Sequence, residues 1–289
     1  MIPAWLNYAW LMIRPKTLTL AITPLLVATS IAWSDTGQLK GGVILALALA
    51  ALLIQIATNI HNDAADFERG TDSAARIGPA RAAVQGWFSA HQIKNAARFC
   101  FAAFWLPMTY LVWIGGWLFI PMALFTVFVA YSYTGGPRPI SNTPFGEVTV
   151  FSFFGLIATG SFYYLQTSQL SVDIVWSGAA LGFFAAAVLL VNNYRDLETD
   201  QDSGRLTLVY YLGRKYSRWL YSALLLLPFS VPALLPVETV IIMLLLPMAL
   251  YLIRRLFIEP VGPNLNSLLA STGKLQLLYG LLMGIAYIV

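Results

Sequence analysis

Residues 42–61, GVILALALAALLIQIATNIH, form an apolar run that leads directly into NDAAD at residues 62–66. A second apolar run, IVWSGAALGFFAAAVLLVNN at residues 174–193, leads in the same way into YRDLETD at residues 194–200. As a helix, each run is long enough to cross the hydrocarbon layer of a membrane, which takes ~20 residues. Carboxylates on such a helix are costly, roughly 2.5–3.5 kcal/mol each at mid-bilayer. We therefore expect both acidic clusters to have a function.

The composition of the whole chain is that of a membrane protein. The 289 residues are 58% hydrophobic and 10% charged, whereas soluble proteins carry about 25% charged residues. Because lipid offers no water to unpaired backbone groups, we predict that the spans are helical. The single cysteine, Cys100, and the two histidines exclude a disulfide framework, a thiolate metal site and a multi-histidine metal centre.

Nine spans are predicted, and glycine, proline and polar residues separate them. They cover residues 17–34, 42–61, 93–113, 117–134, 147–167, 174–193, 219–236, 238–256 and 268–289. The loops with the acidic clusters follow the second and the sixth span, which are four helices apart. This spacing suggests an all-α polytopic membrane protein with two four-helix units plus one helix around a central cavity, in a single domain over residues 1–289.

The basic residues orient the chain in the membrane. With nine spans, sixteen of the seventeen Lys and Arg residues lie on the side of the N-terminus, and Lys40 is the exception. Basic residues stay on the cytoplasmic side of a membrane. We expect a multi-pass protein of the cytoplasmic (inner) membrane, with the N-terminus and both acidic loops in the cytoplasm and the C-terminus outside.

Two sets of polar residues are spaced so that each set shares one helix face, namely Asn59, Asn62, Asp63 and Asp66, and Asn192, Asp196 and Asp200. Extended to Asp72 and to Asp202, the two clusters hold eight of the thirteen acidic residues. Converging carboxylates repel one another unless a cation joins them, and oxygen ligands together with substrate phosphate suit Mg²⁺. The alternative is a solvated helix end with ordinary acids, but the matched positions favour a metal site. The predicted ligands are Asn62, Asp63, Asp66, Asp196 and Asp200.

Arginines lie among and after the acids in both loops, and the guanidinium fork matches the geometry of phosphate oxygens. The positive-inside bias alone is the alternative reason for their position. The predicted diphosphate-binding residues are Arg76, Arg81, Arg195, Arg205, Asn59 and Asn192. A diphosphate site on a membrane protein indicates a lipid-like diphosphate, whose tail lies in an apolar cleft between helices.

Loss of diphosphate from an allylic carbon leaves a carbocation, and metal and arginine stabilise the leaving group. An aromatic ring stabilises a nearby cation by ~0.5–2 kcal/mol. The candidate catalytic residues are therefore Asp63, Asp66, Asp196, Asp200 and Tyr133.

Four stretches resemble the UbiA-type intramembrane aromatic prenyltransferases. They are RPKTL at 14–18, NDAAD at 62–66 with RIGPAR at 76–81, YTGGP at 133–137 with GE at 146–147, and NNYRDLETD at 192–200. Within that superfamily the pattern is most similar to the 1,4-dihydroxy-2-naphthoate polyprenyltransferases of menaquinone biosynthesis. The chain departs from their pattern at Val84 and Arg205, where glutamine and lysine are usual, and these departures bear on the acceptor.

The resemblance implies nine transmembrane helices and a Mg²⁺-dependent reaction. A polyprenyl group passes from its diphosphate to 1,4-dihydroxy-2-naphthoate, the carboxylate leaves as carbon dioxide, and the product is a demethylmenaquinone precursor. By position, the resemblance assigns Mg²⁺ to Asp63, Asp66, Asp196 and Asp200, helped by Asn62 and Asn192. It assigns the diphosphate to Arg76, Arg81 and Arg205.

Two other functions stay open. One is a sister enzyme with another aromatic acceptor, such as 4-hydroxybenzoate, although RIGP at 76–79 and GGP at 135–137 favour the naphthoate. The other is a secondary transporter, which should carry ionisable residues near the bilayer midplane on broken helices. The expected partners are the two substrates and the lipid bilayer, with no nucleic acid. The sequence leaves the prenyl chain length and the oligomeric state open.

Overall fold

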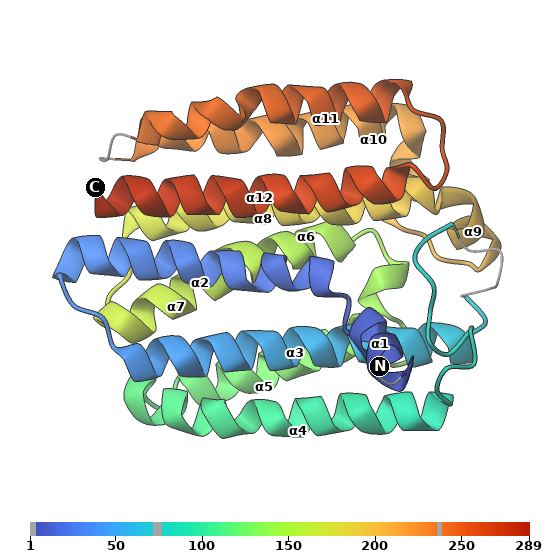
Figure 1. Cartoon of the computed structure of the whole chain (residues 1–289), viewed down its shortest axis with the longest axis horizontal. Coiled ribbons are helices and arrows are strands. Elements are labelled where there is room, and N and C mark those ends of the chain that lie inside the picture. The colour runs from blue at the N-terminus through green and yellow to red at the C-terminus, as the bar shows by residue number, and fades with distance from the viewer. Residues whose placement is uncertain (1–3, 72–76, 236–238) are drawn as a thin grey trace.

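The structure, a computed structural model, describes residues 4–71, 77–235 and 239–289. Every regular element in these residues is a helix, and the long helices run side by side (Figure 1). The elements are α1 (Ala4–Ile13), α2 (Pro15–Thr36), α3 (Gly41–Glu68), α4 (Ala90–Gly115), α5 (Phe119–Ser132), η1 (Ile140–Asn142), α6 (Gly146–Phe151), η2 (Ser152–Ile157), α7 (Ala158–Thr167), α8 (Val172–Arg195), α9 (Leu197–Asp202), α10 (Leu208–Leu226), η3 (Leu227–Leu234), η4 (Thr239–Leu245), α11 (Leu246–Ile258) and α12 (Leu265–Ile288).

Seven helical segments of the described chain are long and apolar enough to cross a membrane. They are Pro15–Thr36, Gly41–Glu68, Ala90–Gly115, Gly146–Thr167, Val172–Arg195, Val240–Ile258 and Leu265–Ile288. The predicted all-helical membrane architecture is therefore confirmed. The number of nine spans is not confirmed, because α5 has only 14 residues and α10 with η3 is not among the seven.

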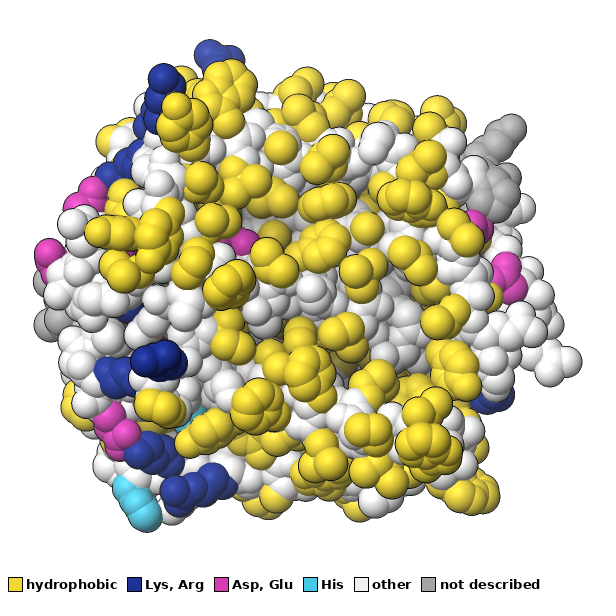
Figure 2. All heavy atoms as spheres, turned by 180° about the vertical axis from the view of Figure 1, so that it is seen from behind, with side chains coloured by type: hydrophobic (Ala, Val, Ile, Leu, Met, Phe, Trp, Pro, Cys, Tyr) yellow, Lys and Arg dark blue, Asp and Glu magenta, His cyan; other side chains and the backbone are white. Residues whose placement is uncertain are grey.

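The surface is divided between hydrophobic side chains and charged ends. Figure 2 shows hydrophobic groups over the middle of one face, whereas most of the Lys and Arg side chains gather at one end. Leu106 and Trp113 of α4 are each 79% exposed. Large apolar side chains that point outward from a helix bundle suit contact with lipid.

The central helix of the bundle is α8, which is buried along most of its length. It packs against α6, η2, α10 and α12. A Cβ atom on Gly155 of η2 would lie 2.6 Å from the carbonyl oxygen of Gly178 and 2.7 Å from Cα of Gly182, both in α8. Small residues let membrane helices approach this closely. The π-helical turn of η2 lies at this contact, and such turns often mark functional regions.

A short helix that the sequence interpretation missed, α1, precedes the first long helix and crosses the bundle near the end of α3 that carries the first acidic cluster (Figure 1). Its Trp5 and Trp10 are each 58% exposed. Tryptophan is enriched at the membrane–water interface, so these two exposed side chains suit contact with the interfacial region. The chain then turns at Arg14, whose φ of 56° is uncommon for a residue other than glycine.

Candidate active site

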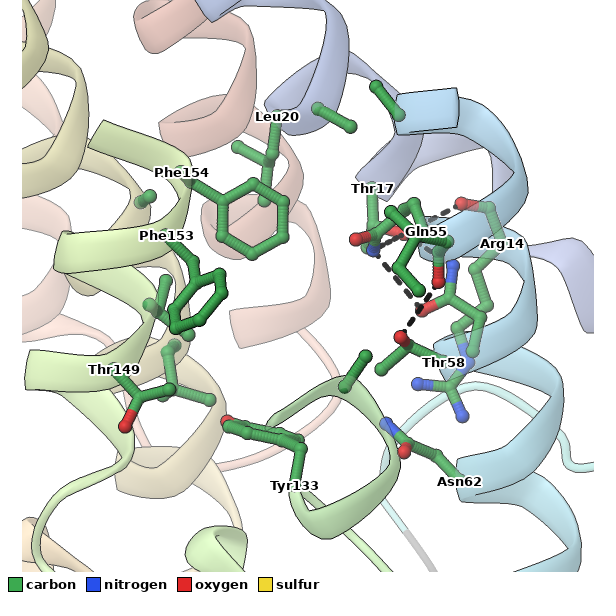
Figure 3. A pocket seen from close by; sticks show the side chains of 18 of the residues that line it. Arg14, Thr17, Leu20, Gln55, Thr58, Asn62, Tyr133, Thr149, Phe153 and Phe154 are labelled. Carbon is green, nitrogen blue, oxygen red and sulfur yellow. Dashed lines mark hydrogen bonds between the residues drawn. The ribbon is translucent and has the colours of Figure 1, made fainter. Parts of the chain in front are cut away.

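A cavity of about 550 Å³ lies inside the bundle and reaches from both acidic clusters to apolar side chains. Its lining includes, from the clusters and the loops after them, Asn62, Asp66, Arg81, Asn192, Asn193, Arg195 and Arg205. Figure 3 shows Phe153 and Phe154 on one side of the cavity and Arg14 and Asn62 on the other. A space with one polar end and one apolar end suits an amphipathic ligand.

The first acidic cluster lies on α3, because this helix continues to Glu68 instead of ending with the apolar run. The expected shared helix face is thereby present for Asn59, Asn62, Asp63 and Asp66. The helix ends where Gly70 adopts a φ of 69°, a conformation that suits glycine. The predicted diphosphate-binding residue Arg76 lies outside the described residues.

Asp66 and Arg81 form the first ion pair at the cavity. The Arg81 Nη2 and the Asp66 Oδ2 are 3.4 Å apart, both side chains are buried, and both residues line the cavity. Two of the predicted site residues, one from the metal set and one from the diphosphate set, are thus brought together. The pair places a basic group and an oxygen ligand at the polar end of the cavity.

Asn62 and Asn59 have partners on other segments. The Thr134 hydroxyl donates a hydrogen bond to the Asn62 Oδ1, and Arg69 donates to the carbonyl oxygens of Thr134 and Gly136. The loop after α5 is thereby held against α3. The Asn59 Nδ2 donates to the carbonyl oxygen of Ile13, 2.8 Å away, and to the Thr17 hydroxyl, 3.0 Å away. Asn59 therefore fixes the start of α2 with both amide protons.

The second acidic cluster is not one continuous helix. The helix α8 ends at Arg195, Asp196 has a φ of −95° and a ψ of 8°, and α9 begins at Leu197. The backbone N–H of Asp200 still donates to the carbonyl oxygen of Asp196 at 2.8 Å. The expectation of one continuous helix is correct for the α3 cluster. In the second cluster, Asn192 lies on α8 and Asp200 lies on α9, on either side of the break at Asp196.

Arg195 is buried and donates hydrogen bonds to three other side chains. It is 1% exposed. Its Nε and Nη2 donate to the two carboxylate oxygens of Asp196 at 2.7 and 2.5 Å. Its Nη2 also donates to the Asn192 Oδ1 at 3.0 Å, and its Nη1 donates to the Asn266 Oδ1 at 2.6 Å. Arg195, which the sequence predicts to bind diphosphate, therefore also holds Asp196, Asn192 and Asn266 in position.

Asp200 and Arg205 form a second ion pair, which matches the first. The Arg205 Nη1 and the Asp200 Oδ1 are 3.4 Å apart, and both side chains are largely buried. The chain reverses between them at Gly204, whose φ is 75°. Arg205 lines the cavity. Each acidic cluster therefore contributes one carboxylate–guanidinium pair of the same separation near the same space.

Asn266 of α12 joins the two loops. Its Nδ2 donates to the carbonyl oxygen of Ile77, 3.1 Å away in the first loop, while its Oδ1 accepts from Arg195 in the second cluster. Asn266 also lines the cavity. The two acidic loops, more than a hundred residues apart in the sequence, thus lie at the same end of the molecule and share one cavity.

Tyr133 lines the cavity beside the end of α5 (Figure 3). A phenol is protonated at neutral pH. Tyr133 can therefore donate a hydrogen bond into the cavity and present a ring face to a cation.

Residues 21–273 match the UbiA prenyltransferase family. The chain belongs to this family. Its relatives include a 1,4-dihydroxy-2-naphthoate octaprenyltransferase of Haemophilus influenzae, 29% identical over 302 residues that cover 100% of this chain and 98% of the relative. Another, of the same name, is found in Mycobacterium leprae and is 32% identical over 289 residues, covering 93% of this chain and 92% of the relative.

Solved structures share the fold. A UbiA homologue from Archaeoglobus fulgidus bound to DMAPP and Mg²⁺ has a TM-score of 0.65 and 17% identity, and the match covers 97% of this chain and 98% of that chain. An apo UbiA homologue from Aeropyrum pernix also has a TM-score of 0.65, with 14% identity over 93% of this chain and 96% of that chain. This family membership gives no support to the transporter alternative.

The donor atoms at the site fit Mg²⁺ in type. Among residues 4–71, 77–235 and 239–289, no three His, Cys, Asp or Glu side chains lie close enough together to hold a metal ion. Asp66, Asn62 and Asn192 nevertheless line the cavity, and Asp200 is paired with the lining residue Arg205. These are oxygen donors, and Mg²⁺ takes one or two carboxylates while substrate phosphates and water complete its shell.

The sequence interpretation missed three site residues. Asn266 follows a proline-rich turn and has no acidic neighbour, so no local signal marks it. Arg14 lines the cavity, and its place in the stretch RPKTL at 14–18 was the available signal. Asn193 lines the cavity, and its Nδ2 donates to the buried Glu147 carboxylate at 2.9 Å. Helical spacing with Asp196 selects Asn192 and not Asn193.

Proposed function

We propose that this chain transfers a polyprenyl group from a polyprenyl diphosphate to 1,4-dihydroxy-2-naphthoate, with loss of the carboxylate as carbon dioxide. The observation that carries the proposal is the single cavity, which has the Asp66–Arg81 and Asp200–Arg205 pairs near its polar end and apolar side chains beyond them. The family membership and the names of the relatives support the same reaction.

In this proposal the diphosphate lies at the polar end, where Arg81 and Arg205 donate hydrogen bonds to its oxygens. Arg76 is proposed to join them. Asp66 and Asp200, with Asn62 and Asn192, would hold Mg²⁺. Bound Mg²⁺ would supply charge neutralisation for the departing diphosphate. The Asp63 oxygens already accept hydrogen bonds from the backbone N–H groups of Ala82 and Ala83, and the Asp196 oxygens accept from Arg195. These two carboxylates are therefore weaker candidates for metal ligands.

The prenyl tail would lie along the apolar lining, where Phe153 and Phe154 keep water away from the reacting carbon. The allylic C–O bond breaks, and its electron pair leaves with the diphosphate. The ring carbon that bears the carboxylate forms the new C–C bond. The C–CO₂ bond then breaks and returns its electrons to the ring. Tyr133 presents its ring face and its hydroxyl to this region.

We further propose nine membrane crossings, with α5 and the α10–η3 segment as the two beyond the seven apolar spans. The N-terminus and both acidic loops would face the cytoplasm of a bacterial cell and the C-terminus would face outward. The positions of the basic residues support this orientation.

The test offers purified protein farnesyl diphosphate, Mg²⁺ and either carboxyl-labelled 1,4-dihydroxy-2-naphthoate or labelled 4-hydroxybenzoate. We expect labelled carbon dioxide and a prenylated naphthalene product from the first acceptor, and neither should form after chelation with EDTA. Prenylation of 4-hydroxybenzoate alone, with no release of carbon dioxide, would instead identify the sister activity. Product formation that is insensitive to EDTA would contradict the Mg²⁺ assignment.

A further inference from the structure

Asp63 contacts a distant loop with both of its carboxylate oxygens. The backbone N–H of Ala82 donates to the Asp63 Oδ2 at 2.9 Å, and the N–H of Ala83 donates to the Oδ1 at 3.0 Å. Asp63 is 2% exposed. Hydrogen bonds to a charged acceptor are stronger than neutral ones, and two of them from successive amides fix both the position and the direction of the loop.

The two amides belong to a segment that is packed as well as hydrogen-bonded. Ala82 and Ala83 are 1% and 6% exposed. Both belong to a small apolar cluster whose other fully buried members are Ile60, Ala64, Ile93 and Ala97 of α3 and α4. The apolar contacts hold the loop against the helices, and the hydrogen bonds to Asp63 select its register along α3.

The residue directly before these amides is Arg81. With residues 82 and 83 fixed on α3, the Arg81 side chain lies against Asp66 and lines the cavity. Asp63 does not line the cavity itself, although Asn62 and Asp66 on either side of it do. Asp63 therefore points to the loop, whereas Asp66, about one turn later, points to the cavity.

We propose that Asp63 is a positioning residue, not a metal ligand, and that it acts on the donor substrate through Arg81. Its two hydrogen bonds to the backbone of residues 82 and 83, here called the clasp, hold Arg81 in position. This proposal rests on the proposed function only in assigning the prenyl diphosphate to Arg81. It divides the first acidic cluster between two tasks, with Asp66 at the metal and Asp63 on the loop.

Replacing Asp63 by asparagine tests the clasp. An amide side chain offers one oxygen in place of two, and its NH₂ group faces an N–H that has lost its acceptor. We expect D63N to raise the KM for farnesyl diphosphate roughly 10- to 100-fold, the range for loss of a hydrogen bond to a charged group. At saturating farnesyl diphosphate, the Mg²⁺ concentration for half-maximal activity should change less than about two-fold, which is the margin of a small binding difference.

The matched control is D66N, which should shift the Mg²⁺ dependence more strongly than D63N does. A second control is R81A, which should raise the KM for farnesyl diphosphate while leaving the loop in place. If Asp63 acts through Arg81, adding D63N to R81A should raise that KM less than about two-fold further, because the two changes remove the same interaction.

A readout without turnover is amide hydrogen exchange of residues 77–89 in the metal-free protein. D63N should exchange faster at Ala82 and Ala83 than wild type, whereas D66N and R81A should not. If D63N does not fold, Asp63→Glu is measured in its place, since it keeps the charge but moves the oxygens away from the two amides. The same exchange pattern is expected.

Unchanged exchange at Ala82 and Ala83, together with a Mg²⁺ requirement raised as much as in D66N, would overturn the proposal and return Asp63 to the metal. The exchange measurement does not depend on the acceptor. Absence of naphthoate prenylation in the wild-type protein would therefore count against the proposed function. The exchange rates of Ala82 and Ala83 would still decide whether Asp63 holds the loop.

Discussion

Single arginines in this protein differ sharply in what they contribute, and Arg195 and Arg214 show the range. Arg195 is buried and donates to Asp196, Asn192 and Asn266. Arg214 pairs with Glu198, whose side chain is 64% exposed. A buried charge left without its partner costs far more than an exposed one, because water does not solvate it.

We predict that Arg195→Lys destabilises the protein by about 1–3 kcal/mol, because an ammonium group does not reproduce the bidentate contact with Asp196 and leaves buried acceptors unsatisfied. Thermal unfolding in detergent measures the change. Arg214→Lys is the matched control and should alter the free energy of unfolding by less than about 1 kcal/mol. Similar unfolding temperatures for the two variants would contradict the structural role of Arg195.

The elements η2 and α8 approach each other closely near the cavity. Gly178 and Gly182 are four residues apart on α8, and Gly155 of η2 lies against both. The neighbouring Phe153 and Phe154 line the cavity. The glycines therefore determine how near the apolar wall of the cavity lies to the helix that carries Asn192 and Arg195.

Gly155→Ala is predicted to destabilise the protein by about 1–3 kcal/mol, since the added methyl group meets backbone atoms that cannot move independently. It should also lower activity by displacing the wall with Phe153 and Phe154. Gly160→Ala, in the same membrane span, is the control, because its Cβ would find only Leu170 at 3.9 Å. Equal thermal stability of the two variants would show that the contact tolerates the methyl group.

The elements that the sequence predicted well are the long apolar ones. The run at 42–61 became α3 and the run at 174–193 became α8, because burial or lipid contact of many apolar residues fixes a helix locally. The helix α1 was missed, since it is short and Asn7 interrupts its apolar residues. For residues 192–200 the expected helical spacing missed the break at Asp196 that separates α9 from α8. Their positions depend on contacts with the rest of the molecule.

The site was predictable in its residue types but not in its pairings. Asp66 and Arg81 from the first loop and Arg195 and Arg205 from the second line one cavity. The partners of Asp63 lie 19 and 20 residues away, and Asn266 contacts a carbonyl 189 residues away. Spacing along one helix contains no information about such distant partners, so the tasks of Asp63 and Arg195 became clear only from the fold.

Across the whole molecule, charge is concentrated at one end, and this asymmetry yields a test of the orientation in the membrane. In a Cys100→Ser background, Gln201→Cys next to the second cluster and Gln38→Cys at the opposite turn are both exposed positions. A maleimide that does not cross membranes should label Gln38→Cys in intact cells and Gln201→Cys only after lysis. The reverse labelling pattern would contradict the proposed orientation.

Asn266 connects the two acidic loops from α12, the last helix of the chain. During translation, both loops leave the ribosome well before this helix does. A nascent chain released before residue 265 would carry all the carboxylates and arginines of the site without the amide that ties their loops together. The connection between the two loops therefore forms only once α12 has packed against α8.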